Sequence, residues 1–180
     1  MRVLIIASGN SANISPFVKE QGSSLKDIGL DIDYFLIKGK GVYGYVKNYF
    51  NLIKLLKKNT YDIIHAHYGL SGLLAILQSY APLVITFHGS DVNLNRINFC
   101  LSFLASRLSD ENIFVHENLP KKLSLFSDQT EIIPCGVNLN LFKPIDKLVS
   151  RDKLGLDHNY SYVLFSSSFN NKIKNAALAK

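Results

Sequence analysis

The segment VITFHGSDVN, residues 84–93, decides the fold because a strand pattern ends within it at a polar turn. Residues 84–87 are β-branched or aromatic, as is typical of an enclosed strand. The four residues that follow, His88 to Asp91, are typical of a turn whose polar groups face a ligand. The segment therefore predicts a binding edge on a sheet, and the rest of the chain bears on what lies there.

Segments with strand and helix character alternate along the chain. Ser15 and Pro16 predict the start of the first helix, as a cap followed by proline at the first helical position. The predicted strands are 2–7, 31–37, 62–67, 83–87, 112–116 and 130–134, and the predicted helices are 16–29, about 45–58, 71–80, 97–109 and 118–126. This alternation predicts an α/β fold, with a Rossmann-like, doubly wound parallel sheet.

Histidines follow the ends of the predicted strands. His65 and His67 end the third strand, His88 ends the fourth and His116 ends the fifth. In open parallel sheets the ligand binds beyond the carboxyl ends of the strands. His65 and His67 are two residues apart in a strand, so both are expected to point to one face. We therefore expect these histidines to line a binding crevice.

The composition limits the kinds of partner. Hydrophobic residues make up 47% of the 180 residues and the net charge is +6, which favours a globular domain with phosphate-bearing or anionic partners. Tryptophan is absent and no basic cluster is interleaved with aromatics, so nucleic acid is not expected as a partner. Two cysteines argue against a disulfide framework and fit a reducing cytosol. No apolar run approaches the roughly 20 residues of a membrane span.

The lysine-rich helix predicted at 45–58 has two interpretations. It places lysines on one face and aliphatic or aromatic residues on another. Such a pattern is typical of an ordinary surface helix. It also fits a helix that rests on an anionic membrane, with Tyr43, Tyr45 and Tyr49 near the headgroups.

The polar residues at the predicted edge leave several kinds of chemistry open. The loop after the first strand, with Ser8 and Ser11, has one glycine and lacks the GxGxxG pattern of a nicotinamide or flavin site. It either faces an anionic ligand or is a plain polar turn. The histidines at 65, 67 and 88, with Asp91, are either zinc ligands of a metal hydrolase or hydrogen-bonding groups. His116 and Glu117 form either an acid–base pair or the start of the next helix.

Five segments in this order resemble one known family: SPFVKEQGSSL, HAHYGLSGLLA, VITFHGSDVN, IFVHENLPKKL and IIPCGVNLNLFKP. They are similar to the amino-terminal domain of family 4 glycosyltransferases, which have the GT-B fold of two Rossmann-like domains. The resemblance implies transfer of a sugar from a nucleotide-sugar donor to a hydroxyl acceptor, with retention of anomeric configuration. It also implies that no catalytic metal or cofactor is needed and that the nucleotide sugar is a substrate.

The resemblance also assigns roles to residues. His88 corresponds to the histidine that reaches the donor sugar, and Asp91 either positions its loop or accepts the proton of the incoming hydroxyl. The residues expected to contact substrates are Gly9, Asn10, His67, His116, Glu117, Gly136 and Lys174. Three positions depart from the family pattern, with Cys135 at a common asparagine, Asn138 at a common aspartate and Ser168 at a common arginine.

The resemblance divides the chain into residues 1–144, an acceptor-side domain, and residues 145–180, a linker with the start of a nucleotide-sugar-binding domain. In the latter, 162–168 is expected to be its first strand and 172–180 its first helix. We therefore expect a fragment that is inactive alone, from a cytoplasmic enzyme of glycan synthesis that sits at the inner face of the cell membrane. The acceptor is expected to be a saccharide or a lipid-linked saccharide.

Two further alternatives stay open. The chain could be a non-catalytic acceptor- or membrane-binding subunit of a split transferase. An unpaired strand at 162–168 leaves its edges open, which would favour a strand-exchange dimer.

Overall fold

The computed structural model describes residues 1–10, 14–39, 41–93, 95–123, 130–167, 169 and 174–179, with backbone alone at 41, 42 and 179. The chain divides into two compact units, Met1–Asn138 and Leu139–Lys180. The first unit holds the sheet and its covering helices. The second holds a short helix, α7 (Lys147–Leu154), and a 3₁₀ turn, η2 (Ala176–Ala179).

The first unit is built on a six-stranded sheet in the order β2-β1-β3-β4-β5-β6. Every neighbouring pair of strands is parallel. The strands are β1 (Arg2–Ser8), β2 (Asp31–Ile37), β3 (Ile63–His67), β4 (Leu83–Phe87), β5 (Glu111–Phe114) and β6 (Thr130–Ile132). The strand order reverses between β1 and β3, and in such sheets the binding crevice opens at that point. The predicted sheet is therefore confirmed.

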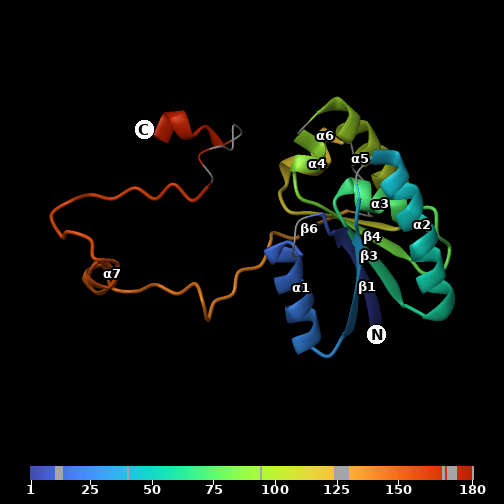
Figure 1. Ribbon diagram of the computed structural model, residues 1–180, viewed down its shortest axis with the longest axis horizontal. Coiled ribbons are helices and arrows are strands. Elements are labelled where there is room, and N and C mark those ends of the chain that lie inside the picture. Colours follow the sequence, from blue (N-terminus) through green and yellow to red (C-terminus); the bar gives the residue numbers. More distant parts are fainter. Residues whose placement is uncertain are drawn as a thin grey trace. The chain divides into compact units, whose positions relative to one another are not determined.

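Helices cover both faces of the sheet (Figure 1). The helices of the first unit are α1 (Pro16–Asp27), α2 (Gly41–Lys58), α3 (Gly69–Ala75), α4 (Ser90–Asn93), α5 (Arg96–Leu108) and α6 (Asn118–Lys122). Helix α1 packs on one face, where Val18 joins the inward residues Val3 and Ile5 of β1. Helices α2, α3 and α5 cover the other face, over a larger core that includes Ile85 and Phe87 of β4.

Close contacts between α3 and its neighbours explain its small residues. A Cβ atom on Gly72 would lie 2.4 Å from Cδ1 of Ile85 in β4, and one on Gly69 would lie 2.2 Å from Oγ of Ser102 in α5. Distances this short are incompatible with a side chain. The two glycines therefore let α3 lie directly against the sheet and against α5.

Helix ends differ from the sequence prediction. Helix α2 begins four residues earlier, at Gly41, and α3 ends at Ala75 rather than at residue 80. The four-residue α4 was not predicted, because so short a turn has no period to detect. Ser15 precedes α1, yet its side chain makes no capping hydrogen bond, while Pro16 lies in the first turn as expected. Helix α6 ends at Lys122, and residues 124–126 of its predicted range lie outside the described residues.

The strand predicted at 162–168 is wrong for the described part of that range, since residues 162–167 form no strand. An isolated extended segment has no ladder of hydrogen bonds to stabilise it. Within 172–180, the described helical structure is confined to Lys174 and η2. No helix in the described part of the chain is both long and apolar enough to cross a bilayer.

Candidate active site

Three histidine rings stack at the carboxyl edge of the sheet. The ring centroids of His65 and His67 lie 4.6 Å apart, and those of His67 and His88 lie 5.3 Å apart. Alternate residues of β3 point to one face, and His88 directly follows the neighbouring strand β4. We call these three residues the histidine stack. The prediction that His65 and His67 share a face is confirmed.

Hydrogen bonds fix the rings of the stack. His65 Nε2 lies 2.7 Å from the Thr86 hydroxyl, and His67 Nδ1 lies 3.0 Å from His88 Nε2. His67 is fully buried, whereas His88 is half-buried at the rim. The stack thus runs from the interior to the surface and ends in His88.

All three imidazoles are neutral at pH 7. Burial lowers the pKa of His65 to about 4 and that of His88 to about 4. For His67, burial and the neighbouring histidines lower the pKa to about 2. In the hydrogen bond between His67 and His88, one of the two facing nitrogens must therefore carry a proton and donate it, and the other must be bare and accept it.

The surroundings of His67 indicate which ring donates. Its Nε2 is buried and has no hydrogen-bond partner among the described residues. A buried N–H without an acceptor is the rarer arrangement in proteins, so we place the proton of His67 on Nδ1, where His88 Nε2 accepts it. Neutral His88 then carries its own proton on Nδ1. The hydrogen bond from buried His67 therefore makes Nδ1 of His88 a hydrogen-bond donor at the rim.

Three residues that the sequence analysis did not assign surround the exposed end of His88. Its ring centroid lies 4.5 Å from that of Phe17 in α1 and 4.7 Å from that of Tyr68. The Cys135 sulfur lies 3.9 Å from His88 Nδ1, the nitrogen to which we assign the proton. Tyr68 adopts a φ of 71°, which turns the chain sharply between β3 and α3. The sequence could have pointed to Tyr68, because it directly follows the His-Ala-His segment. Phe17 carried no such signal, because it looked like an ordinary residue of a helix.

Asp91 holds the turn after β4 in place. One of its carboxylate oxygens accepts the N–H of Gly89 at 2.8 Å, and the other accepts those of His88 and Gly69, each at 3.3 Å. The carboxylate is buried, and that burial raises its pKa although the backbone hydrogen bonds oppose the shift. This geometry favours the first of the two expected roles, which is to position the loop.

The loop after β1 is held against β2. Gly9 donates its N–H to the carbonyl of Ile37 at 2.8 Å, and a Cβ atom on Gly9 would lie 2.8 Å from Cβ of Leu36. The Asn10 side chain donates to the Gly39 carbonyl at 3.1 Å and accepts its N–H at 2.8 Å. The close approach to Leu36 thus explains why residue 9 is a glycine. The Asn10 amide joins the loop after β1 to the loop after β2. Ser11 lies outside the described residues.

The structure does not join the remaining predicted residues to the stack. His116 is exposed and its Nδ1 accepts the N–H of Asn118, a local bond at the start of α6. Glu117 is exposed at the same helix start, and its side chain makes no capping bond there. Gly136 is exposed beside Cys135, and a Cβ atom there would contact nothing within 4 Å. These geometries give no support to an acid–base pair at His116 and Glu117.

Lys174 is exposed in the second unit, and its expected contact with the donor stays a prediction. Ser168 lies outside the described residues. In the part of the chain that the structure describes, no group of three His, Cys, Asp or Glu side chains is arranged to hold a metal ion. The facing nitrogens of His67 and His88 instead bind one another.

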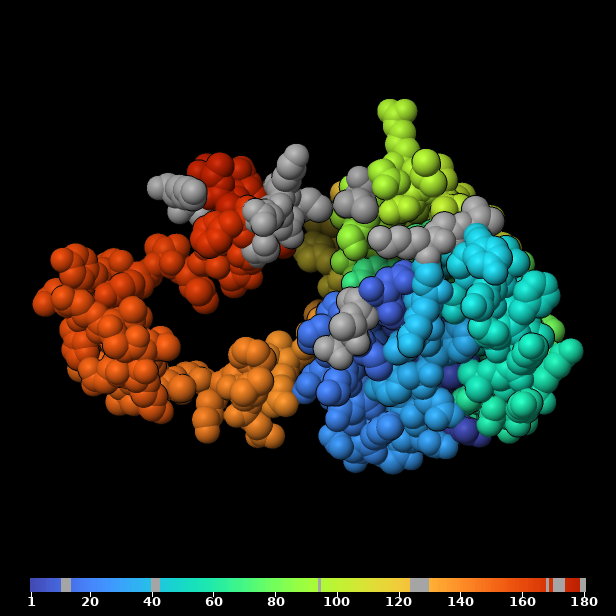
Figure 2. Space-filling view, viewed as in Figure 1, coloured from blue at the N-terminus to red at the C-terminus, as the bar shows by residue number. Residues whose placement is uncertain are grey.

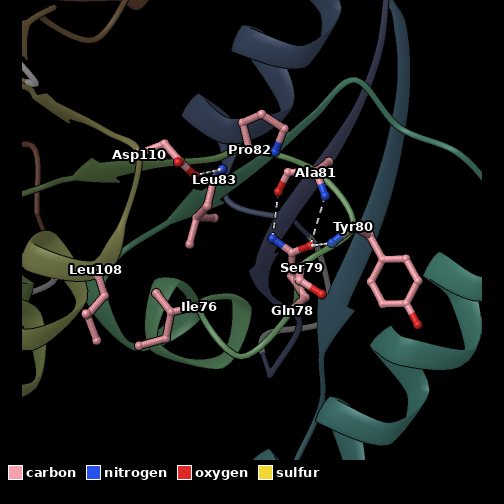
Figure 3. A pocket seen from close by; sticks show the side chains of 9 residues that line it. All are labelled: Ile76, Gln78, Ser79, Tyr80, Ala81, Pro82, Leu83, Leu108 and Asp110. Atoms are coloured by element: carbon pink, nitrogen blue, oxygen red, sulfur yellow. Dashed lines mark hydrogen bonds between the residues drawn. The ribbon is translucent and has the colours of Figure 1, made fainter.

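A cavity of about 410 Å³ lies at the opposite edge of the sheet, beside the start of β4 (Figure 3). The Gln78 side chain closes its loop by hydrogen bonds to the backbone of Tyr80 and Ala81, and Asp110 accepts the Leu83 N–H. These bonds stabilise a connection at the amino ends of the strands. The cavity is therefore separate from the histidine stack.

Comparison with known families decides the affiliation of the chain. The model of glycosyltransferase family 4 matches residues 3–141, which include the sheet, the histidine stack and Asp91. The chain belongs to glycosyltransferase family 4. The resemblance noted in the sequence is thus confirmed, and the fold is the amino-terminal Rossmann-like domain of a GT-B protein.

Relatives of this family 4 chain include an Escherichia coli UDP-Gal:alpha-D-GlcNAc-diphosphoundecaprenol alpha-1,3-galactosyltransferase. The two are 32% identical over 130 residues, which cover 63% of this chain and 34% of that protein.

Solved structures share the fold at lower identity. Sucrose-phosphate synthase from Thermosynechococcus elongatus is 19% identical with a TM-score of 0.73, over 88% of this chain and 53% of that one. Anabaena Alr3699/HepE in complex with UDP and glucose is 15% identical with a TM-score of 0.60, over 86% of this chain and 50% of that one. The chain thus spans about a third of the curated relative and about half of the solved structures that it matches.

Proposed function

We propose that this chain is the acceptor-side domain of a glycosyltransferase that moves a sugar from a nucleotide sugar to a saccharide or lipid-linked saccharide, with retention of anomeric configuration. The observation that carries the proposal is His88, a neutral imidazole at the carboxyl edge of a family 4 sheet. A sugar presents hydroxyls, and a fixed neutral N–H is a suitable donor to them. A cationic imidazole is not required for that role.

His88 acts by orienting the donor sugar. Its Nδ1–H donates to a sugar hydroxyl that takes the place of the Cys135 thiol, while Phe17 and Tyr68 hold the ring from its sides. Asp91 fixes the backbone of the turn, so the imidazole is held in place before the substrate arrives. Both Asp91 oxygens already accept backbone N–H groups, so positioning the turn is the role that we propose for this carboxylate.

The donor is a nucleotide sugar, and no separate cofactor or metal takes part in the proposed reaction. UDP and glucose are bound in the Anabaena structure that shares this fold, and the E. coli relative is named for UDP-Gal. Since the chain spans about a third of that relative, we propose that further polypeptide supplies most of the nucleotide site. Lys174 is proposed to contact the donor pyrophosphate, a pairing of a cation with an anion.

The acceptor is proposed to be lipid-linked, with the protein at the cytoplasmic face of a membrane. The E. coli relative is named for a diphosphoundecaprenol-linked sugar. Helix α2 carries Lys47, Lys54, Lys57 and Lys58, and its sequence contains no Asp or Glu. A row of cations of this kind is attracted to anionic lipid headgroups.

The test is a transfer assay on the native polypeptide that contains residues 1–180, purified from its source cells. A panel of radiolabelled nucleotide sugars is offered with a saccharide linked through diphosphate to a short isoprenoid. Label moving to the acceptor, in a product that keeps the anomeric configuration of the donor, is the expected result. Release of free sugar without transfer, or no reaction with any donor, contradicts the proposal.

A further inference from the structure

An apolar groove lies between α2 and α3 and reaches α5. Its volume is about 440 Å³, and every side chain that lines it is aliphatic or aromatic. Helix α2 contributes Val46 and Phe50, α3 contributes Leu70, the turn after α3 contributes Leu77, and α5 contributes Leu101. Helix α2 lies at the surface of the first unit (Figure 2, cyan).

The lining side chains are exposed to an unusual degree for their size. Phe50 is 60% exposed, Leu77 is 64% exposed and Val46 is 48% exposed. The Tyr49 hydroxyl donates to the Leu77 carbonyl at 3.3 Å, which joins α2 to the turn after α3 and satisfies the polar end of that side chain. The groove is therefore a preformed apolar surface that lacks the polar groups a carbohydrate needs.

Cations lie beside this groove. Lys47 precedes Phe50 by three residues and Lys54 follows it by four, so both share its side of α2, and Lys47 lies in the half of α2 that begins at the carboxyl edge of the sheet. No Asp or Glu occurs between Asp33 and Asp62, and no α2 lysine forms an ion pair with the described residues of the chain. An apolar groove edged by unpaired cations complements an amphiphile with an anionic head, rather than a neutral protein surface.

The groove also begins at the candidate active site. Leu70 lines it, and the preceding residue, Gly69, donates its N–H to Asp91. A molecule that lies along the groove from Leu77 to Leu70 therefore ends at the edge where His88 stands.

From these features we infer that the groove between α2 and α3 binds the isoprenoid chain of a lipid-linked acceptor, whose phosphates contact Lys47 of α2. This inference rests on the proposed function for the identity of the acceptor. The hydrocarbon is held by burial against the leucines and Phe50, and the head group is directed toward the sheet edge.

The test measures binding to the 180-residue chain without any sugar transfer. The probe is farnesyl diphosphate, below the concentration at which it forms micelles, followed by calorimetry and by the NMR signals of leucine methyl groups. We expect saturable binding at one site, with shifts at Leu70, Leu77 and Leu101. Geranyl diphosphate, with one isoprene unit fewer, should bind at least about tenfold more weakly because less hydrocarbon is buried. Inorganic diphosphate alone should shift none of these methyl signals.

The variant Leu77→Asp places a charge in the groove at an exposed position and should weaken farnesyl diphosphate binding by at least about tenfold. The matched control, Ile28→Asp, changes a residue that is 73% exposed beyond the end of α1 and should bind as the wild type does. Equal binding by Leu77→Asp and wild type overturns the inference. So does a chain that binds phosphatidylglycerol vesicles through Leu77 but ignores the soluble isoprenoid, because the occupant is then a bilayer.

The two proposals fail in different ways. Sugar transfer with no isoprenoid binding removes the groove assignment alone. Isoprenoid binding without transfer from any nucleotide sugar removes the proposed function and leaves the groove as a lipid site.

Discussion

His67 Nδ1 lies 3.0 Å from His88 Nε2, so a fully buried ring and a half-buried one are joined by a single hydrogen bond. Because both imidazoles are neutral, this bond decides which nitrogen of His88 carries its proton. The chemistry at the rim therefore depends on a residue whose side chain is fully buried in this chain. The predictions below test that dependence and the packing that supports it.

The first prediction concerns the tautomer of His88. Nitrogen-15 NMR at pH 7 should find His88 protonated on Nδ1 and bare on Nε2, with His67 also protonated on Nδ1. In His67→Phe the donor to His88 is lost, and His88 should become a mixture of both tautomers. His67→Asn, whose amide can donate from nearly the same place, should restore the Nδ1 form. An unchanged His88 tautomer in His67→Phe would contradict the assignment.

The second prediction concerns stability against acid. A histidine with a pKa near 6.5 in the unfolded chain and about 4 in the folded one binds protons first when unfolded, so its contribution to stability falls as pH drops below 6.5. His65→Gln should reduce the slope of unfolding free energy against pH by up to about 1.4 kcal/mol per pH unit between 6.5 and 5. Denaturant titrations at several pH values measure this slope.

The control for that slope is Thr86→Val. It removes the hydroxyl that bonds to His65 without removing a titrating group, so it should lower stability with little change in slope. A His65→Gln slope equal to that of the wild type would mean that folded His65 takes up its proton as an unfolded histidine does.

The third prediction concerns Asp91. Asp91→Asn replaces one accepting oxygen by an NH₂ group that faces backbone donors, and should cost about 2 kcal/mol of stability. If the carboxylate only positions the turn, the rate of sugar transfer should decrease because His88 is held less firmly. The pH dependence of kcat should then keep its shape. Loss of one limb of the pH profile in Asp91→Asn would instead identify Asp91 as the proton acceptor.

The fourth prediction concerns packing under α3. Gly72→Ala places a methyl group against Cδ1 of Ile85 and should destabilise the fold by about 2–3 kcal/mol. Adding Ile85→Val removes that Cδ1 atom and should recover part of the loss, as a double-mutant cycle would measure. Additive losses in the double variant would show that the two side chains do not compete for the same space.

Much of the fold was predictable because each strand is a short apolar run bounded by turn residues. All six strands of the sheet were placed within about two residues, and the sharing of one face by His65 and His67 followed from the strand period. The strand at 162–168 was predicted from the same kind of run. Periodicity alone gives no information on whether a partner strand is present.

The site was only partly predictable. The strand-end rule located His67 and His88, but it also selected His116, because the rule gives the edge of a sheet and not the direction of a side chain. Phe17 and Cys135 reach His88 from residues 71 positions before it and 47 after it, and no local pattern connects them. Asn10 carried a polar group that looked free, yet its amide is bound to Gly39.

The most direct test of the account is sugar transfer by the native polypeptide with His88→Ala, compared with the wild type and with His158→Ala, the one histidine away from the predicted strand ends. Removing a ring that packs on Phe17 and Tyr68 should cost about 1–2 kcal/mol, which leaves the chain folded by circular dichroism. We predict that transfer by His88→Ala falls by at least about 100-fold while His158→Ala keeps its activity. Transfer near the wild-type rate by folded His88→Ala would contradict the account.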